Sequence, residues 1–183
     1  EYSMFPGGLS TFTDSTVFEI ICDDWYIIWK VDGKEYLRTR RKKGIGYQVY
    51  STFHEVGNLL KDARWGGYPG LLPLNRETAL TNVGLPDGNV TRTGNNYEKT
   101  SGDINWFDAD MHSETILADR AHASFRASTD VLAGLTDTPG LASTGRFEAG
   151  VQLYASDNSF RVFEGTSQIW DGRTDGAIVA WSD

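Results

Sequence analysis

The chain has 183 residues, with 17 Lys or Arg against 25 Asp or Glu, so its formal net charge is −8. This acidity favours solubility and repels polyanions at long range, which disfavours general nucleic-acid binding. Hydrophobic residues make up 39% of the chain and aromatic residues 13%, which is enough for a packed core and argues against disorder. The longest apolar run, residues 17–31, is too short and too charged to cross a bilayer, so no membrane insertion is expected.

A mostly antiparallel β fold of this length needs no division, so we expect a single domain over residues 1–183. Cys22, the one cysteine, lies in the apolar run VFEIICDDW and is expected to be a small buried hydrophobe. Glu1 stands where a start Met would, which suggests a mature or excised fragment. A β-rich, aromatic, acidic and loop-heavy chain with one cysteine is typical of the surface or virion proteins of bacteria and their viruses, so we expect an extracellular, cell-surface or virion-surface location.

The N-terminal third predicts strands. The Gly-, Ser- and Thr-rich opening, residues 1–16, is expected to be a flexible or exchanged arm. Alternation in WYIIWKV predicts a strand with one face made of Trp25, Ile27, Trp29 and Val31. Asp32-Gly33 then predicts a type I′ hairpin turn, because that turn needs positive φ at both central residues. The return strand is expected over residues 35–40.

The next alternating run, IGYQVYSTF, has one face made of Ile45, Tyr47, Val49 and Phe53. It extends the hairpin to a predicted three-stranded meander. Residues 54–104 then form a predicted loop-rich insertion, because Pro69, Pro73, Pro86 and many Gly and Asn residues interrupt the pattern. Only NLLKDAR offers a helical turn. A region of this length is either a functional loop or contains strands that the pattern does not reveal.

Residues 105–127 have an ambiguous period. Ser113 could cap a short helix with Leu117, Ala121 and Phe125 at four-residue spacing, and we favour that interpretation over a strand. In the C-terminal third, RFEAGVQLY, SFRVF, TSQIW and AIVAW are four short strands separated by turn residues. The expected fold is therefore all-β and mostly antiparallel, a β-sandwich or jelly-roll-like domain with a long loop-rich middle.

Aromatic residues are the main candidates for ligand contact. Trp65, Tyr68 and Tyr97 lie in Gly-, Pro- and Asn-rich sequence, and exposed loop aromatics on β scaffolds often anchor sugar rings or protein partners. The other tryptophans lie in strand-like runs and are expected in the core; they are Trp25, Trp29, Trp106, Trp170 and Trp181.

A basic cluster interrupts the acidic chain in the segment RTRRKK. Its members are Arg38, Arg40, Arg41, Lys42 and Lys43. Such a cluster can bind sulfate, phosphate, acidic sugars or an acidic face of another subunit, although a solvated hairpin end has the same composition.

No cofactor motif is found, and a divalent metal ion is the one candidate. In a strand Asp108, Asp110 and His112 would share a face, and two carboxylates with an imidazole suit Mn²⁺ or Zn²⁺, or Ca²⁺ if carbonyls and water replace the imidazole. The solvent-facing side of any strand also alternates in this way. Asn89-Val90-Thr91 is a glycosylation sequon among turn residues, which predicts an exposed loop at residues 85–99.

The sequence offers little for catalysis, because HEVGN lacks the second His of a zinc protease and G-x-S-x-G is absent. We therefore expect a non-enzymatic surface module that binds carbohydrate or another cell-surface ligand through aromatic loops. One alternative is a structural homo-oligomer of a filament or virus particle, assembled through sheet edges and charged loops. Another is a glycan-active hydrolase with a carboxylate pair drawn from Glu19, Asp23, Asp24 and Glu148.

Overall fold

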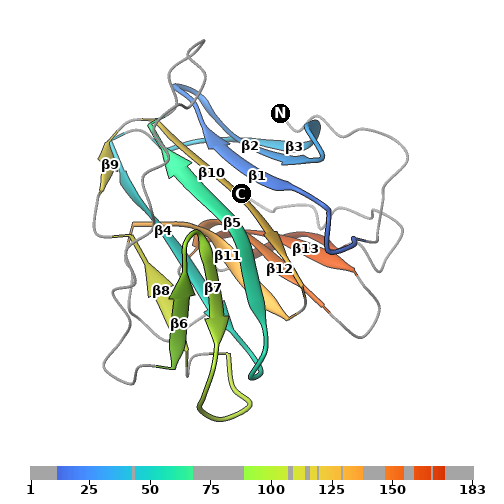
Figure 1. Cartoon of the computed structure of the whole chain (residues 1–183). Helices are drawn as coiled ribbons and strands as arrows, with labels where there is room; N and C mark the ends of the chain where they lie inside the picture. The colour runs from blue at the N-terminus through green and yellow to red at the C-terminus, as the bar shows by residue number, and fades with distance from the viewer. Residues whose placement is uncertain are drawn as a thin grey trace.

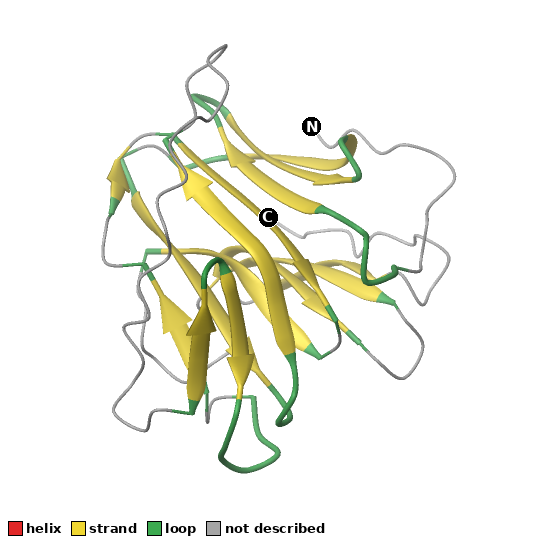
Figure 2. Ribbon diagram, viewed as in Figure 1, coloured by secondary structure: helices red, strands yellow, loops and turns green. Residues whose placement is uncertain are grey.

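The computed structural model describes most of the chain between residues 12 and 171. The described residues are 12–42, 44–67, 89–106, 109–113, 116–118, 120–128, 130–137, 147–154, 159–165 and 167–171. Every regular element in these ranges is a β-strand, and none is a helix (Figure 2). Accordingly, no helix in this part of the chain has the length and apolar character needed to cross a membrane.

The strands form two antiparallel sheets packed face to face, so the fold is a β-sandwich (Figure 1). Sheet I has the spatial order β3 (Lys34–Arg40), β2 (Tyr26–Val31), β1 (Phe18–Cys22), β10 (Ala121–Ala127), β5 (Leu59–Gly66), β7 (Asn96–Lys99) and β6 (Val90–Thr93). Sheet II has the order β14 (Ser167–Asp171), β13 (Phe160–Gly165), β12 (Phe147–Leu153), β11 (Val131–Thr136), β4 (Gly46–Phe53) and β8 (Asp110–His112), and the short β9 (Leu117–Ala118) also pairs with β4.

The core lies between the sheets, where side chains from both meet. In β2, Ile27, Trp29 and Val31 point inward, as their alternation predicts. Cys22 is buried in the same core, and burial raises the pKa of its thiol to about 12, so it behaves as the expected small hydrophobe. Phe18 of β1 stacks on Phe125 of β10 at 5.8 Å between ring centroids, which ties neighbouring strands of sheet I together.

The predicted type I′ turn at Asp32-Gly33 is confirmed. Asp32 and Gly33 have φ values of 50° and 76°, the positive values that a type I′ turn requires. The return strand is β3, as expected. The three-stranded meander is wrong, however, because β4 leaves sheet I and pairs with β11 and β8 of sheet II. Its inward face is the predicted one, with Tyr47, Val49 and Phe53 in the core.

The predicted short helix after Ser113 is wrong. Its region contains β9 and β10, and in β10 the buried residues alternate with partly exposed ones along the whole strand. Ala121, Ala123 and Phe125 face the core at two-residue spacing, which is the period of a strand. The helix interpretation is based on the four-residue spacing between Ala121 and Phe125. The strand is favoured over the helix because β10 pairs with β1 on one side and with β5 on the other, in the middle of sheet I.

The loop-rich middle contains three strands. NLLKDAR lies mainly in β5 rather than in a helical turn, and residues 90–99 form the β6–β7 hairpin. The prediction of an exposed loop through residues 85–99 is therefore wrong for the hairpin, whose two strands pair with each other. Residues 85–88 lie outside the described part of the chain.

The C-terminal meander is confirmed for β12, β13 and β14, while the expected strand AIVAW lies outside the described residues. A bulge in β12 between Phe147 and Gly150 turns Phe147 away from the main core. Phe147 instead packs with Tyr50 and Leu132 in a smaller cluster. Its ring lies so close to Gly150 that a Cβ there would be 2.9 Å from it, so glycine allows this packing.

Candidate functional site

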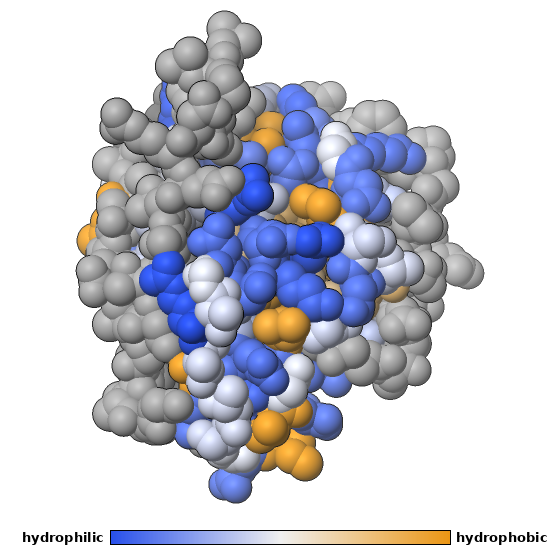
Figure 3. All heavy atoms as spheres, in the orientation of Figure 1, coloured by the Kyte–Doolittle hydropathy of each residue, from blue (hydrophilic) through white to orange (hydrophobic). Residues whose placement is uncertain are grey.

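The outer face of sheet I carries polar side chains on three neighbouring strands. Glu19, Arg64, His122, Ser124 and Arg126 each lie between two core residues of their strand, so their side chains point away from the core. Figure 3 shows hydrophilic residues gathered over the middle of the visible face, with small separate hydrophobic spots. This set, on β1, β10 and β5, is called the polar face below.

Opposite charges are paired along the polar face. Nε2 of His122 lies 3.1 Å from Oε2 of Glu19, and Arg126 forms an ion pair with Asp62 of β5. At the end where β10 begins, Nε of Arg120 donates to Oδ1 of Asp24 at 2.7 Å. The face therefore presents donors and acceptors in alternation rather than a single sign of charge.

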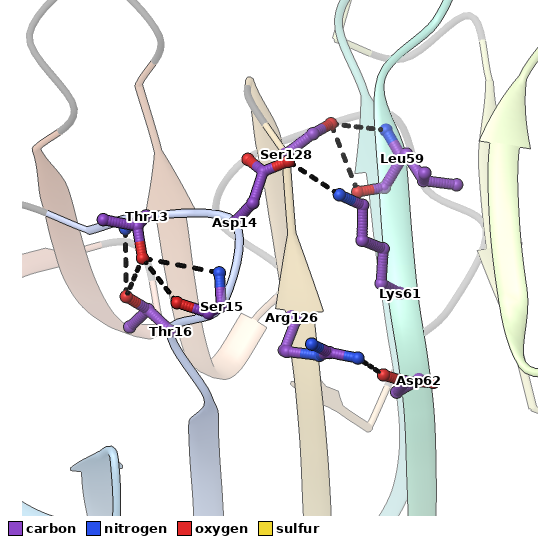
Figure 4. A network of polar contacts seen from close by, with 9 residues as sticks. All are labelled: Thr13, Asp14, Ser15, Thr16, Leu59, Lys61, Asp62, Arg126 and Ser128. Atoms are coloured by element: carbon purple, nitrogen blue, oxygen red, sulfur yellow. Dashed lines mark hydrogen bonds and ion pairs between the residues drawn. The ribbon is translucent and has the colours of Figure 1, made fainter.

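A hollow of about 220 Å³ opens at the other end of the polar face. It is lined by Val17, Asp62, Arg64, Ser124, Phe125 and Arg126. Figure 4 shows the Arg126 side chain from β10 pointing toward Asp62 of β5, beside the segment that carries Asp14. Nζ of Lys61 donates to Oδ2 of Asp14 at 2.8 Å, so this segment is tied to the strand that borders the hollow. The volume is below the usual 300–1,000 Å³ of ligand pockets, so it suits a single small group.

Trp25 lies in the β1–β2 turn, next to the Asp24–Arg120 ion pair, and its relative exposure is 63%. Asp23 builds this turn, since its Oδ1 accepts hydrogen bonds from the backbone amides of Trp25 and Tyr26, both at 2.7 Å. The expectation that Trp25 belongs to the core is therefore wrong. Six residue steps separate Arg120, directly before β10, from Arg126 near the end of that strand, so the face extends about 20 Å from this turn to the hollow.

Two of the three predicted loop aromatics lie in the core. Trp65 lies in β5 with 3% relative exposure, and Tyr97 lies in β7, fully buried. Both belong to the core between the sheets. Burial raises the pKa of the Tyr97 hydroxyl to about 12, and the Arg92 guanidinium over its ring opposes the shift. The prediction of exposed ligand anchors is wrong for these two residues, and Tyr68 lies outside the described residues.

In the basic cluster, two arginines are hydrogen-bonded within the protein and two other residues are exposed to solvent. Arg38 makes two 2.8 Å hydrogen bonds to the carboxylate of Glu35 and lies over the ring of Tyr26. Arg41 donates to the backbone carbonyl of Asp23 at 2.6 Å and lies over Tyr47. Arg40 and Lys42 are exposed, and Lys43 lies outside the described residues. Since β3 is an edge strand, this charge fits protection of the edge against pairing.

The predicted metal-ligand strand is present in part. Asp110 and His112 lie in β8, but Asp110 is buried and accepts a 2.6 Å hydrogen bond from the Tyr50 hydroxyl. Burial raises the pKa of the Asp110 carboxyl, which disfavours its charged form. Asp108 lies outside the described residues. Among the residues that are described, the group able to hold a metal ion is instead His54, Glu55 and Asp130.

The sequon residue Asn89 immediately precedes β6. Its Oδ1 accepts a hydrogen bond from the Ser101 hydroxyl at 2.7 Å, and its carbonyl accepts one from the amide of Thr100 at 2.8 Å. The side chain is partly exposed. Glycosylation at Asn89 remains a prediction.

Two acidic residues lie on adjacent strands of sheet II. Glu148 lies in the β12 bulge and Glu164 in the adjacent β13. Burial raises the pKa of both carboxyls, with a further rise from Asp137 for Glu148 and from Glu148 for Glu164. Carboxyls that resist ionisation are the type used as general acids, so this pair is the closest match to the predicted carboxylate pair.

Sequence reasoning missed the polar face because its members come from distant segments. Glu19 and His122 are 103 residues apart in the chain. One local signal was available for Trp25, since Asp23-Asp24 directly before it is typical of a turn and interrupts the strand pattern. Comparison of the sequence with models of known protein families gives no match, and a search of curated proteins finds no similar sequence.

Proposed function

We propose that the chain is a non-enzymatic binding module that holds a neutral, hydroxyl-rich saccharide on the polar face. The observation that supports this most is the alternation of paired donors and acceptors along β1, β10 and β5. Each sugar hydroxyl both donates and accepts a hydrogen bond, so a charge-balanced face suits it better than it suits a polyanion. Trp25, which is 63% exposed in the turn at this end of the face, would supply an aromatic surface for one sugar ring.

In this proposal the ligand binds to a surface made of strands, and not to the aromatic loops that the sequence predicted. A rigid strand scaffold orders few groups on binding, which limits the entropic cost. The hollow beside Arg64 and Ser124 would receive one substituent, and the rest of the chain of sugars would lie along β10. A surface module of this kind would act where polysaccharide is exposed, which agrees with the expected extracellular location.

A glycan array followed by calorimetry tests the proposal. Trp25→Ala is expected to weaken saccharide binding about tenfold, since an aromatic contact worth about 1.4 kcal/mol corresponds to that factor. Arg64→Ala should also weaken binding, because it removes donors at the hollow. Ile104→Ala is the matched control, because Ile104 is an exposed apolar residue in the β7–β8 connection. Absence of binding to all neutral saccharides, or equal losses in the control, would contradict the proposal.

Glycan hydrolysis is the second candidate, favoured by the position of Glu148 and Glu164 on the paired strands β12 and β13, where both are partly buried and burial raises the pKa of each carboxyl. It predicts slow release of sugar from a bound polysaccharide, abolished by Glu148→Gln or Glu164→Gln with binding retained. No turnover by the unaltered chain on any saccharide that it binds would remove this candidate. Self-assembly through sheet edges is less well supported, because the edge strand β3 carries the exposed charge of Arg40.

A further inference from the structure

Two connections between the sheets meet at one end of the sandwich. The β4–β5 connection leaves sheet II at His54, and the β10–β11 turn, which contains Asp130, leaves sheet I. The backbone amide of His54 donates a hydrogen bond to the carbonyl of Asp130 at 3.2 Å. This contact holds the two connections side by side, although the residues are far apart in the chain.

Three potential ligand side chains converge there. His54, Glu55 and Asp130 each offer one ligand atom, and these atoms all lie within 4.8 Å of one another. Nδ1 of His54 is 3.6 Å from Oε1 of Glu55. Zinc bonds of about 2.0–2.1 Å place two ligand atoms of a tetrahedral site about 3.4 Å apart. The distance between Nδ1 of His54 and Oε1 of Glu55 is therefore already close to the required value. The ligand atom of Asp130 lies within 4.8 Å of the other two.

The surrounding contacts hold the ligand backbone in place. Oδ1 of Asn58 accepts a hydrogen bond from the backbone amide of Glu55 at 2.5 Å, and the backbone amide of Asn58 donates to the carbonyl of Glu55 at 3.1 Å. The carbonyl of His54 accepts from Nζ of Lys99 at 3.2 Å. The imidazole of His54 packs on the Trp106 ring with 5.0 Å between centroids, which restricts its rotation. A ligand set with ordered supports loses less entropy when an ion binds.

We propose that His54, Glu55 and Asp130 bind one divalent transition-metal ion, Zn²⁺ or Mn²⁺, which links the two connections between the sheets. One imidazole and two carboxylates are ligands of these ions, whereas Ca²⁺ prefers oxygen ligands alone. Water would complete the coordination, because two of the three side chains are partly exposed and the third is exposed. The ion would stabilise the fold, since it binds the folded arrangement and the unfolded chain separates the ligands.

Calorimetry and thermal unfolding of the full chain, after chelator treatment and dialysis, test this site. Zn²⁺ or Mn²⁺ is expected to bind with one ion per chain and to raise Tm by roughly 5–10 °C at a hundredfold excess over Kd. Asp130→Asn should abolish most of the effect while preserving the backbone, because Asn tolerates the φ of 36° at this position. His54→Gln should act in the same way. His112→Gln is the control, since His112 lies on β8.

Binding of neither ion at millimolar concentration overturns the proposal. Tighter binding of Ca²⁺ than of Zn²⁺ and Mn²⁺ would also overturn it. The same holds if Asp130→Asn leaves metal binding unchanged, or if His112→Gln loses as much metal binding as Asp130→Asn. A measurement on the unaltered chain avoids dependence on variant folding: paramagnetic Mn²⁺ should broaden the amide resonances of residues 54, 55 and 130 and the indole signal of Trp106. Broadening centred elsewhere, for example at Asp110, would also overturn the assignment.

Discussion

Nε2 of His122 on β10 contacts Oε2 of Glu19 on β1 at 3.1 Å, diagonally across two strands whose register places Glu19 opposite Ser124. The hydrogen bond from His122 lowers the pKa of Glu19, and burial opposes this shift. The contact joins the two strands at the centre of the polar face. It also couples the stability of the fold to pH.

The carboxylate of Glu19 is expected to stabilise the fold above its ordinary pKa of 4.5. Because the folded pKa is lowered, the unfolded chain takes up the proton first, and the stabilisation is lost as pH falls through the folded value. Glu19→Gln should therefore lose up to about 1 kcal/mol near neutral pH, and the difference from the unaltered chain should vanish in acid. Urea unfolding from neutral pH into acid measures this. The exposed Glu98 on β7 supplies the control Glu98→Gln, and an equal pH-dependent difference there would contradict the interpretation.

Gly134 of β11 lies directly opposite Gly150 of β12, and a Cβ on Gly134 would be 2.1 Å from the carbonyl oxygen of Ala149. Backbone cannot move aside as a flexible side chain can. Gly134→Ala is therefore expected to reduce the free energy of unfolding by about 2 kcal/mol or more. Gly67→Ala is the matched control, because its nearest neighbour is an ordinary contact at 3.9 Å. Equal midpoints of urea unfolding for the two variants would show that β11 and β12 pair differently.

The fold class and the local turns could be predicted from the sequence, because both depend on near neighbours. The Asp32-Gly33 turn is an example, since its two φ values follow from the residue types. The sheet that β4 joins could not be predicted, because that depends on pairing with β11, about eighty positions later. The polar face shares this limit. Its contacts connect strands that are distant in the chain, such as β1 and β10, where Glu19 and His122 are 103 residues apart, and alternation gives no register between them.

The two tryptophans Trp25 and Trp65 should respond oppositely to truncation. Trp65→Ala is expected to cost about 3–5 kcal/mol of unfolding free energy, because it leaves a large cavity between the sheets. Trp25→Ala should change stability by less than about 0.5 kcal/mol, since its ring is mostly in solvent. Thermal unfolding distinguishes them. A stability loss in Trp25→Ala as large as in Trp65→Ala would show that the Trp25 ring is packed against the protein.

Lys99 is fully buried, and its Nζ donates to the backbone carbonyls of His54 and Asp103 at 3.2 and 2.6 Å. Lys99→Met keeps the length of the side chain but leaves these carbonyls without the charged donor. We expect a loss of about 2 kcal/mol and faster hydrogen exchange at the amide of Asn105, which bonds to His54. Lys42→Met, at an exposed position, should change neither quantity. Unchanged exchange in Lys99→Met would mean that other contacts order this connection.

Chemical-shift mapping with the tightest-binding neutral oligosaccharide tests the central proposal most directly. The account predicts that perturbed amides form one continuous surface over β1, β10 and β5, from Trp25 through His122 and Ser124 to Arg64 at the hollow. Amides of sheet II and of the connection that contains Ile104 should remain unchanged. Perturbations confined to sheet II, or none at saturating saccharide, would contradict the assignment of the polar face as the binding surface.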